Sequence, residues 1–264
     1  MALAGVLGYP VGHSRSPAMM NAAFLECGLD WNYVKLPVPP ALFAETVRAL
    51  PASGYAGVNV TIPHKLAAFE LADEASPAAE AIGAANTLSF ANGRIRAENT
   101  DAGGLLEALE EPVAGRRALV LGAGGAGRAA AWALREAGAE VSVWNRTPRR
   151  AAALAEELGI THAAAPGPTE VLVNATSIGL TPALEEDEAL AALGLAGTPP
   201  PETVVDLVYG ERPTPLWTWA SRGDGRVVGG LEVLVRQGAL SFELWTGQPA
   251  PVDAMRHAVS PSGA

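Results

Sequence analysis

The chain contains the stretch Ala118-Leu-Val-Leu-Gly-Ala-Gly-Gly-Ala-Gly-Arg-Ala-Ala-Ala-Trp-Ala-Leu134. It begins with a short apolar run, turns on glycines and continues as an alanine-rich segment with strong helix propensity. This order predicts a strand, a glycine turn and a helix whose free N–H groups face phosphate oxygens, as in a Rossmann unit. In such a corner Gly122 permits the tight turn, Gly124 lets the backbone approach a pyrophosphate, and Gly127 lets the helix pack close to the strand.

The next apolar run, residues 141–147, predicts the strand that ends beside the adenosine ribose of a dinucleotide. A site that prefers NAD usually has a carboxylate there, which accepts a hydrogen bond from the 2′-OH. This chain instead has Asn145, Arg146, Thr147, Arg149 and Arg150. Arginines bind a dianionic phosphate well, so these residues predict NADP(H) as the cofactor. The alternative is that the arginines are only the solvated start of a helix.

The composition excludes several classes of protein. The 264 residues suit one large domain or two small ones, and a net charge of −10 argues against binding to nucleic acid or a membrane surface. The single cysteine, Cys27, excludes an internal disulfide and a cysteine metal cluster, and no metal site is expected. We find no apolar run long enough to span a membrane and no signal peptide, so we expect a cytoplasmic protein. The oligomeric state stays open, a homodimer included.

A loop follows the first predicted strand and carries two serines, Ser14 and Ser16, ahead of Pro17. Pro17 suits the first position of a helix, which predicts Ser16 as the N-cap. The two hydroxyls then have two interpretations. They either cap the helix, or they hold a small carboxylate beside the helix N-terminus.

The third predicted strand, residues 54–61, carries Asn59 and Thr61, which period-2 alternation places on the same side. His64 and Lys65 then open a helix at the carboxyl edge of a strand, where α/β sheets bind ligands. A lysine is disfavoured by the dipole at a helix start, and this chain has only one other lysine, Lys35. We therefore interpret Lys65 as functional rather than as a solvent-facing lysine, and His64 as a packing or turn residue.

Further polar residues follow predicted strands. Asn86 lies in a strand expected over residues 82–90, and Asn92-Gly93 predicts a type I′ hairpin turn. Thr100 could cap the next helix, with Asp101 in its first turn, where dipole compensation is an alternative to function. Thr176 and Ser177 lie in a loop after the strand over 171–174, where they could hold nicotinamide or ribose. A strand is expected over 203–209, and the acidic segment 182–201 is left unassigned.

Taken together, these motifs resemble the shikimate dehydrogenase family, in order and spacing and over nearly the whole chain. The motifs are Ser14-Arg-Ser-Pro17, Asn59-Val-Thr-Ile-Pro-His-Lys65, Gly83-Ala-Ala-Asn-Thr87, Asn99-Thr-Asp-Ala-Gly103, Gly122-Ala-Gly-Gly-Ala126, Asn145-Arg-Thr147 and Asn174-Ala-Thr-Ser-Ile-Gly179. The resemblance implies reversible, NADP-linked reduction of 3-dehydroshikimate to shikimate in aromatic amino-acid biosynthesis. The chain departs from the family pattern at Leu180, where a methionine is common in the family.

The resemblance also implies a fold and a set of site residues. It implies an α/β protein of two domains: a substrate domain with a mixed sheet (1–101, completed by 237–264) and a Rossmann-type NADP domain with a parallel sheet (102–236). By the family pattern Lys65 and Asp101 form the catalytic pair, with the proton assigned to neither. The substrate would be bound by Ser14, Ser16, Asn59, Thr61, Asn86, Asp101, Tyr209 and Gln237. The cofactor would be bound by Gly122, Ala123, Gly124, Gly125, Ala126, Asn145, Arg146, Thr147, Arg149, Arg150, Thr176, Ser177, Leu207 and Gly230.

The chemistry agrees with these residues. Hydride transfer to a ketone leaves an alkoxide, so the site needs a proton donor within about 3 Å. A lysine can both stabilise that charge and give the proton, while an aspartate orients it and binds a hydroxyl. Two alternatives remain: a paralogue that acts on quinate or uses NAD, and a noncatalytic NADP sensor.

Overall fold

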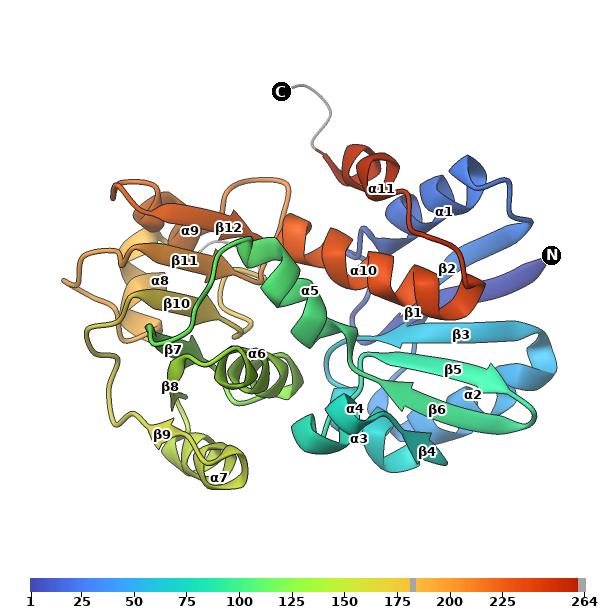
Figure 1. Cartoon of the computed structure of the whole chain (residues 1–264), viewed down its shortest axis with the longest axis horizontal. Helices are drawn as coiled ribbons and strands as arrows, with labels where there is room; N and C mark the ends of the chain where they lie inside the picture. The colour runs from blue at the N-terminus through green and yellow to red at the C-terminus, as the bar shows by residue number, and fades with distance from the viewer. Residues whose placement is uncertain (181–183, 261–264) are drawn as a thin grey trace. The chain divides into compact units, whose positions relative to one another are not determined.

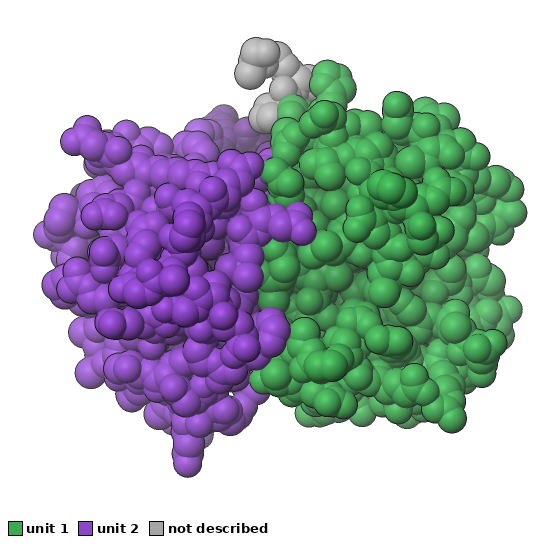
Figure 2. Space-filling view, viewed as in Figure 1, with its two compact units in different colours: residues 1–104, 234–264 green, residues 105–233 purple. Residues whose placement is uncertain are grey.

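Contacts along the chain divide the protein into two units, which Figure 2 colours green and purple. Unit 1 comprises residues 1–104 and 234–264, and unit 2 comprises residues 105–233. The structure is a computed structural model that describes residues 1–180 and 184–260. The last four residues of the expected substrate domain, and residues 182 and 183 of the unassigned segment, lie outside this range. The unit boundaries fall within two helices, α5 (Thr100–Leu109) and α10 (Gly230–Thr246).

Unit 1 is built on a mixed sheet, whose strands in the described residues have the order β2-β1-β3-β5-β6-β4 (Figure 1). The strands are β1 (Ala2–Gly8), β2 (Trp31–Pro37), β3 (Tyr55–Val60), β4 (Glu74–Ala75), β5 (Thr87–Ala91) and β6 (Arg94–Glu98). β1 pairs in parallel with β2 and β3, whereas β5 is antiparallel to β3 and β6. The predicted hairpin is confirmed, since Asn92 and Gly93 connect β5 to β6 with φ of 53° and 74°.

The helices of unit 1 come from both ends of the chain. They are α1 (Ser16–Glu26), α2 (Phe43–Ala49), α3 (Lys65–Leu71), α4 (Pro77–Ile82), α11 (Val252–Val259) and parts of α5 and α10, with the 3-10 turns η1 (Pro40–Leu42) and η2 (Pro51–Ser53). Aromatic stacking helps to hold α10 to the N-terminal part, because the rings of Phe242 and Phe24 lie 5.6 Å apart. α10 also approaches α1 closely: a Cβ at Gly238 would lie 2.2 Å from Met19 Cε.

Unit 2 is built on a parallel sheet, whose strands in the described residues have the order β12-β11-β10-β7-β8-β9. The strands are β7 (Arg117–Leu121), β8 (Glu140–Trp144), β9 (Thr161–His162), β10 (Val171–Asn174), β11 (Thr203–Asp206) and β12 (Arg226–Gly229). The helices are α6 (Gly125–Glu136), α7 (Pro148–Leu158), α8 (Glu186–Ala192) and α9 (Pro215–Ala220). The strand order reverses between β7 and β10, which is the switch point at which doubly wound sheets bind nucleotides.

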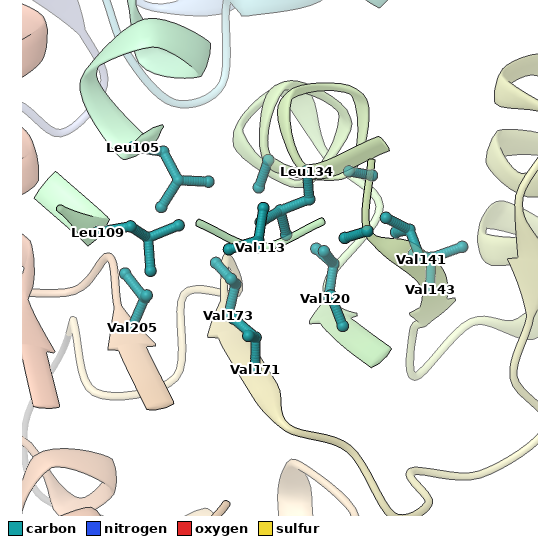
Figure 3. Packing of buried hydrophobic residues seen from close by; sticks show 14 of the residues in the cluster. Leu105, Leu109, Val113, Val120, Leu134, Val141, Val143, Val171, Val173 and Val205 are labelled. Atoms are coloured by element: carbon teal, nitrogen blue, oxygen red, sulfur yellow. The ribbon is translucent and has the colours of Figure 1, made fainter. Parts of the chain in front are cut away.

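Both faces of the parallel sheet are buried at its central strands, and alternate residues of these strands supply the two faces. Val120, Val171 and Val173 face one hydrophobic cluster, to which α6 contributes Leu134 (Figure 3). Leu119, the residue before Val120, and Leu172, between Val171 and Val173, belong to the cluster on the other face. Burying each such side chain contributes about 1.5–3 kcal/mol, so the apolar runs that predicted the strands also fix the sheet. The expected fold class is confirmed.

Several expected element bounds are wrong. Residues 82–86 precede β5, because Ser76 caps α4 and Gly83, with φ of 67°, ends it after Ile82. The strand expected over 203–209 ends at Asp206. The segment left unassigned contains α8, whose N-terminus has a capping box between Glu185 and Glu188.

Two expected caps are also wrong. Ser16 is the first residue of α1, with Arg15 at the N-cap position. Thr100 is the first residue of α5, and the side chain of Asn99 accepts a hydrogen bond from Ala102 N instead, at 3.3 Å. In the residues that the structure describes, we find no helix long and apolar enough to cross a membrane and no acidic, histidine or cysteine cluster that could hold a metal ion.

Candidate active site

The polar motifs of unit 1 meet at one edge of its sheet. β1 and β3 are parallel, so their carboxyl ends lie together, and Tyr9 N donates to Ile62 O at 3.0 Å. β5 is antiparallel to β3, so its beginning lies at the same edge, and Val60 N donates to Asn86 O at 2.7 Å. The mixed sheet thus places residues 61–65 beside Asn86, although the chain from Lys65 to Asn86 forms two helices and a short strand.

The catalytic residues expected from the sequence form an ion pair. Lys65 is the first residue of α3 and Asp101 lies in the first turn of α5. Lys65 Nζ lies 2.5 Å from Asp101 Oδ2, and the two side chains are 13% and 20% exposed. The pair is therefore shielded from bulk water, while a part of each group remains accessible to a ligand.

Asn86 holds the other oxygen of Asp101. Its Oδ1 accepts a hydrogen bond from Thr100 N at 2.7 Å, and a backbone N–H can only donate, so the amide Nδ2 faces the other way. Nδ2 donates to Asp101 Oδ1 at 2.9 Å and lies 3.2 Å from Gln237 Oε1. Both oxygens of Asp101 thus have donors, which fixes the orientation of the carboxylate toward Lys65.

Gln237 reaches this site from α10. A Cβ at Gly104 would lie 2.6 Å from Gln237 N, so a glycine at this position permits the close approach of α5 and α10. The side chain of Gln237 is 7% exposed, and its Nε2 donates to Leu234 O at 2.7 Å. Three expected residues, Asn86, Asp101 and Gln237, are thus in direct contact.

Ser14 and Ser16 form a second pair. They are 8% and 5% exposed, and their Oγ atoms lie 3.2 Å apart. Ser14 Oγ also accepts from Ser16 N at 3.3 Å, and Lys35 Nζ donates to Gly12 O in the same loop. Between residues 1–180 and 184–260 no hydrogen bond joins these serines to Lys65, Asn86 or Asp101.

Asn59 and Thr61 differ in burial and in hydrogen bonding, although the sequence predicted that they lie on the same side of the strand. Thr61 is half-buried, and its hydroxyl makes no hydrogen bond to any described residue, so it can bind a ligand. Asn59 is 5% exposed and its amide is engaged at both ends. Its Oδ1 accepts from Tyr33 OH at 2.7 Å, and its Nδ2 donates to Ser241 Oγ at 2.9 Å.

His64 is a packing residue, as expected. It is 2% exposed, its ring stacks on Phe43 with centroids 4.6 Å apart, and Nε2 donates to Val38 O at 2.7 Å. Burial is the main reason why the pKa of His64 lies below its ordinary value. The imidazole therefore anchors the beginning of α3, immediately before Lys65.

In unit 2 each glycine of the predicted corner has a different environment. Gly122 has φ of 109°, which suits a tight turn, and a Cβ at Gly127 would lie 2.1 Å from Gly122 O. A Cβ at Gly124 would meet no described atom within 4 Å. Gly124 is also the N-cap of α6, and in the described residues no side chain caps that helix. The first N–H groups of α6 therefore suit an anion.

The arginines after β8 lack carboxylate partners in the described part of the chain. Arg146, Arg149 and Arg150 are exposed and form no ion pair there, whereas Arg128 pairs with Glu157. The loop is ordered by Asn145 Nδ2, which donates to the carbonyl of Thr147 at 3.1 Å. Three unpaired guanidinium groups at the end of this strand fit a phosphate group.

The remaining cofactor residues lie at the ends of β10 and β11. Thr176 Oγ1 donates to Asn174 Oδ1 at 2.7 Å, so it shapes its own loop, while Ser177 is exposed. Leu207 lies against Gly230, because a Cβ at Gly230 would be 2.7 Å from Leu207 O. Ala123 and Ala126 belong to the corner already described, and Tyr209 is half-buried in the loop after β11.

Several buried polar residues were not expected from the sequence. Asp206 is 1% exposed; Asn174 Nδ2 donates to its Oδ1 at 2.9 Å, and Thr214 Oγ1 donates to its Oδ2. Burial raises the pKa of Asp206. In unit 1 the residues not expected are Tyr33 and Ser241, while Thr87 was named only within a motif and Thr100 only as a helix cap. Ser241 follows Gln237 by four residues, one helical turn, and this spacing could have identified it.

A doubly wound sheet with an uncapped glycine corner, and a separate unit with a shielded lysine–aspartate pair, place the chain among the dinucleotide-dependent dehydrogenases. Family models match the shikimate dehydrogenase substrate binding domain over residues 6–88, shikimate / quinate 5-dehydrogenase over residues 105–172 and the shikimate 5′-dehydrogenase C-terminal domain over residues 230–259. The chain belongs to the shikimate dehydrogenase family, which confirms the resemblance found in its motifs.

Individual relatives resemble the chain over nearly its whole length. It is 48% identical to the shikimate dehydrogenase (NADP(+)) of one strain of Thermus thermophilus, over 92% of this chain and 91% of the relative. Identity to the Methanothermobacter thermautotrophicus enzyme of the same name is 42%, over 97% and 94%. The crystal structure of the enzyme from another Thermus thermophilus strain, in complex with NADP(H) and shikimate, is 42% identical, with a TM-score of 0.84 over 98% of each chain. The cofactor named for these relatives is the one expected from the sequence.

Proposed function

We propose that this chain catalyses the reversible, NADP-dependent reduction of 3-dehydroshikimate to shikimate, a step of aromatic amino-acid biosynthesis. The observation that carries the proposal is the contact of 2.5 Å between Lys65 Nζ and Asp101 Oδ2, in a chain of the shikimate dehydrogenase family. Unit 1 would bind the substrate and unit 2 the cofactor. NADP, when bound, supplies or accepts the hydride.

Lys65 would hold the proton of the reaction at Nζ. In the direction of reduction the carbonyl carbon gains a hydride, and its oxygen becomes an alkoxide that needs a proton and a positive charge nearby. An ammonium group provides both, and its contact with Asp101 Oδ2 keeps it from turning into solvent. In the reverse direction the neutral amine accepts the proton of the hydroxyl group.

The remaining polar groups of unit 1 suit the other groups of the substrate. Ser14 and Ser16 lie side by side near the start of α1 and would bind the carboxylate. The hydroxyl of Thr61 and the amide of Gln237 would bind ring hydroxyls, beside Asn86 and Asp101. Tyr209, in unit 2, is the further residue that the family pattern assigns to the substrate carboxylate. All of these residues belong to one chain, so the proposal does not require a homodimer.

The residues of unit 2 fit NADP. The uncapped beginning of α6 and the open space at Gly124 suit a pyrophosphate. Arg146, Arg149 and Arg150, with Asn145 and Thr147, would bind the 2′-phosphate, which is the group that distinguishes NADP from NAD. Leu207, Gly230, Thr176 and Ser177 would lie beside the nicotinamide ribose and ring.

An absorbance assay at the NADPH band tests the proposal directly. Purified protein with shikimate and NADP should produce NADPH, and kcat/KM should be larger for NADP than for NAD. Activity only with other substrates, or no activity with either cofactor, would refute it. The second outcome would support a noncatalytic NADP sensor, provided that NADP still binds.

Quinate is the substrate that this assay must include for comparison. One of the matching family models describes both shikimate and quinate dehydrogenases, and the ring hydroxyls that unit 1 would contact are common to the two acids. We expect the larger kcat/KM with shikimate. A larger value with quinate would identify the chain as a quinate-using member of the family.

A further inference from the structure

A cluster of neutral polar side chains lies beneath the catalytic pair in unit 1. Its members are Tyr33, Asn59, Thr87, Thr100 and Ser241, which we call the hydroxyl cluster. They are between 0% and 8% exposed. They come from β2, β3, β5, α5 and α10, so the cluster joins three strands to the two helices that carry Asp101 and Gln237. Buried polar groups cost free energy unless they are hydrogen-bonded, so their arrangement is tightly constrained.

Ser241 lies at the centre of this cluster. Its Oγ donates to Gln237 O at 3.1 Å, because a carbonyl oxygen can only accept, and this uses its single proton. Toward its other neighbours it can only accept, and its two lone pairs can serve two of the three groups beside it. Asn59 Nδ2 lies at 2.9 Å, Thr87 Oγ1 at 3.0 Å and Thr100 Oγ1 at 3.1 Å. A neighbouring hydroxyl that bonds to Ser241 must therefore be the donor.

A chain of hydrogen bonds leads from Ser241 to Lys65. When the Thr100 hydroxyl donates to Ser241, its lone pairs face Asn86 Nδ2, which lies 2.9 Å away. The same Nδ2 donates to Asp101 Oδ1 at 2.9 Å, and Asp101 Oδ2 meets Lys65 Nζ. Each group in this series is held by the one before it.

From this geometry we infer that Ser241 is a positioning residue for the reaction. It acts through Thr100 and Asn86 to fix the carboxylate of Asp101, and hence the ammonium of Lys65, without touching the substrate. The same reasoning makes Asn59 a positioning residue rather than a substrate contact, because its amide is used within the cluster.

This inference rests on the proposed function, and Ser241→Ala tests it. Alanine favours a helix, so the variant should fold. We expect kcat for shikimate oxidation to fall roughly tenfold, the effect of losing one buried hydrogen bond at a site whose geometry controls the rate. KM for NADP should not change. Ser241→Thr, which keeps the hydroxyl, should restore most of kcat.

Ser76→Ala is the matched control. Ser76 is also a buried serine of unit 1, but its Oγ caps α4 through Ala79 N at 3.2 Å and lies outside the cluster. It should lower the melting temperature and leave kcat unchanged. Tyr33→Phe, which removes the hydroxyl at the far end of the cluster, gives a second measurement and should lower kcat two- to threefold.

The possible results separate the two claims. If the wild-type chain does not oxidise shikimate, the proposed function fails and the role of Ser241 fails with it. If the wild type is active and kcat of Ser241→Ala stays within twofold of it, only the positioning role fails. The same conclusion follows if Ser76→Ala loses as much kcat as Ser241→Ala, because the loss would then report stability alone.

Discussion

The two candidate sites of this chain differ in the groups that form them, which are side chains in unit 1 and backbone groups in unit 2. In unit 1 the groups that would act on the substrate are side chains, each held by other side chains: Lys65 by Asp101, and Asp101 by Asn86. In unit 2 the corner that would hold the pyrophosphate is backbone, shaped by glycines that carry no side chain. A Cβ at position 127 would collide with the backbone of Gly122, so the fold requires Gly127. A Cβ at Gly124 would meet no described atom.

This difference follows from what each site has to do. Proton transfer needs specific atoms with the correct charge, and such atoms are placed most accurately by a network of hydrogen bonds. A pyrophosphate needs several donors and a close approach, which the N-terminus of a helix supplies without side chains. Substitutions in the site of unit 1 should therefore lower kcat, and substitutions in the corner of unit 2 should weaken the binding of the cofactor.

The largest effect should come from Lys65→Ala. Removing a general acid or base costs roughly 10²–10⁴-fold in rate, so kcat should fall by that amount while the affinity for shikimate changes less. Steady-state kinetics and a shikimate binding titration measure the two quantities. Arg94→Ala, which removes the cation of an exposed ion pair with Glu74, is the control and should leave kcat unchanged. An unaltered kcat in Lys65→Ala would refute the catalytic role.

A smaller effect, on binding alone, should come from Gly124→Ala. Its φ of −89° is open to alanine and the added methyl meets no described atom, so the melting temperature should not change. The methyl would keep a phosphate away from the helix start. Losing one hydrogen bond to a charged group costs about 1.5–3 kcal/mol, so KM for NADP should rise roughly 10- to 100-fold with KM for shikimate unchanged.

Gly127→Ala is the counterpart that separates affinity from folding. Its Cβ would lie 2.1 Å from Gly122 O, so the backbone of the corner must move. Overpacking of this kind typically costs about 1–3 kcal/mol, and the melting temperature should fall. If Gly124→Ala were the less stable of the two variants, the distinction between a glycine for the fold and a glycine for the ligand would be wrong.

The same contrast explains what the sequence could predict. The glycine corner lies within six residues, from Gly122 to Gly127, so its pattern is local and could be recognised directly. The hydroxyl cluster is not local, because Ser241 lies 182 residues from Asn59 and 141 from Thr100 in the chain. The family resemblance implied Lys65, Asp101 and Gln237 as site residues, but only the fold shows that the amide of Asn59 is bonded within the hydroxyl cluster.

Element bounds were mispredicted where local signals competed. The run from Ile82 to Phe90 contains enough apolar and β-branched residues to suggest one strand. The N-cap Ser76 and the left-handed Gly83 instead define α4, and Ile82 is buried as the last residue of that helix. In this segment the capping residues Ser76 and Gly83, and not the apolar run, determine the secondary structure. Attention to these two residues would have corrected the predicted strand.

The smallest effect concerns His64, the residue before Lys65, whose ring anchors the beginning of α3. Burial lowers its pKa, so between pH 6.5 and that lowered value the unfolded chain binds a proton that the folded chain does not. Stability contributed by the neutral ring is present above pH 6.5 and is lost as the pH falls through the folded pKa. His64→Gln can keep a donor to Val38 O but does not titrate, so its melting temperature should fall less between pH 7.5 and pH 5.5 than that of the wild type.

Some dependence of the melting temperature on pH should remain in this variant, because partial burial and Lys35 also lower the pKa of His13. His257→Gln, at an exposed position, is the control; an equal loss of stability in His64→Gln and the wild type would show that His64 does not carry the acid sensitivity of this part of unit 1.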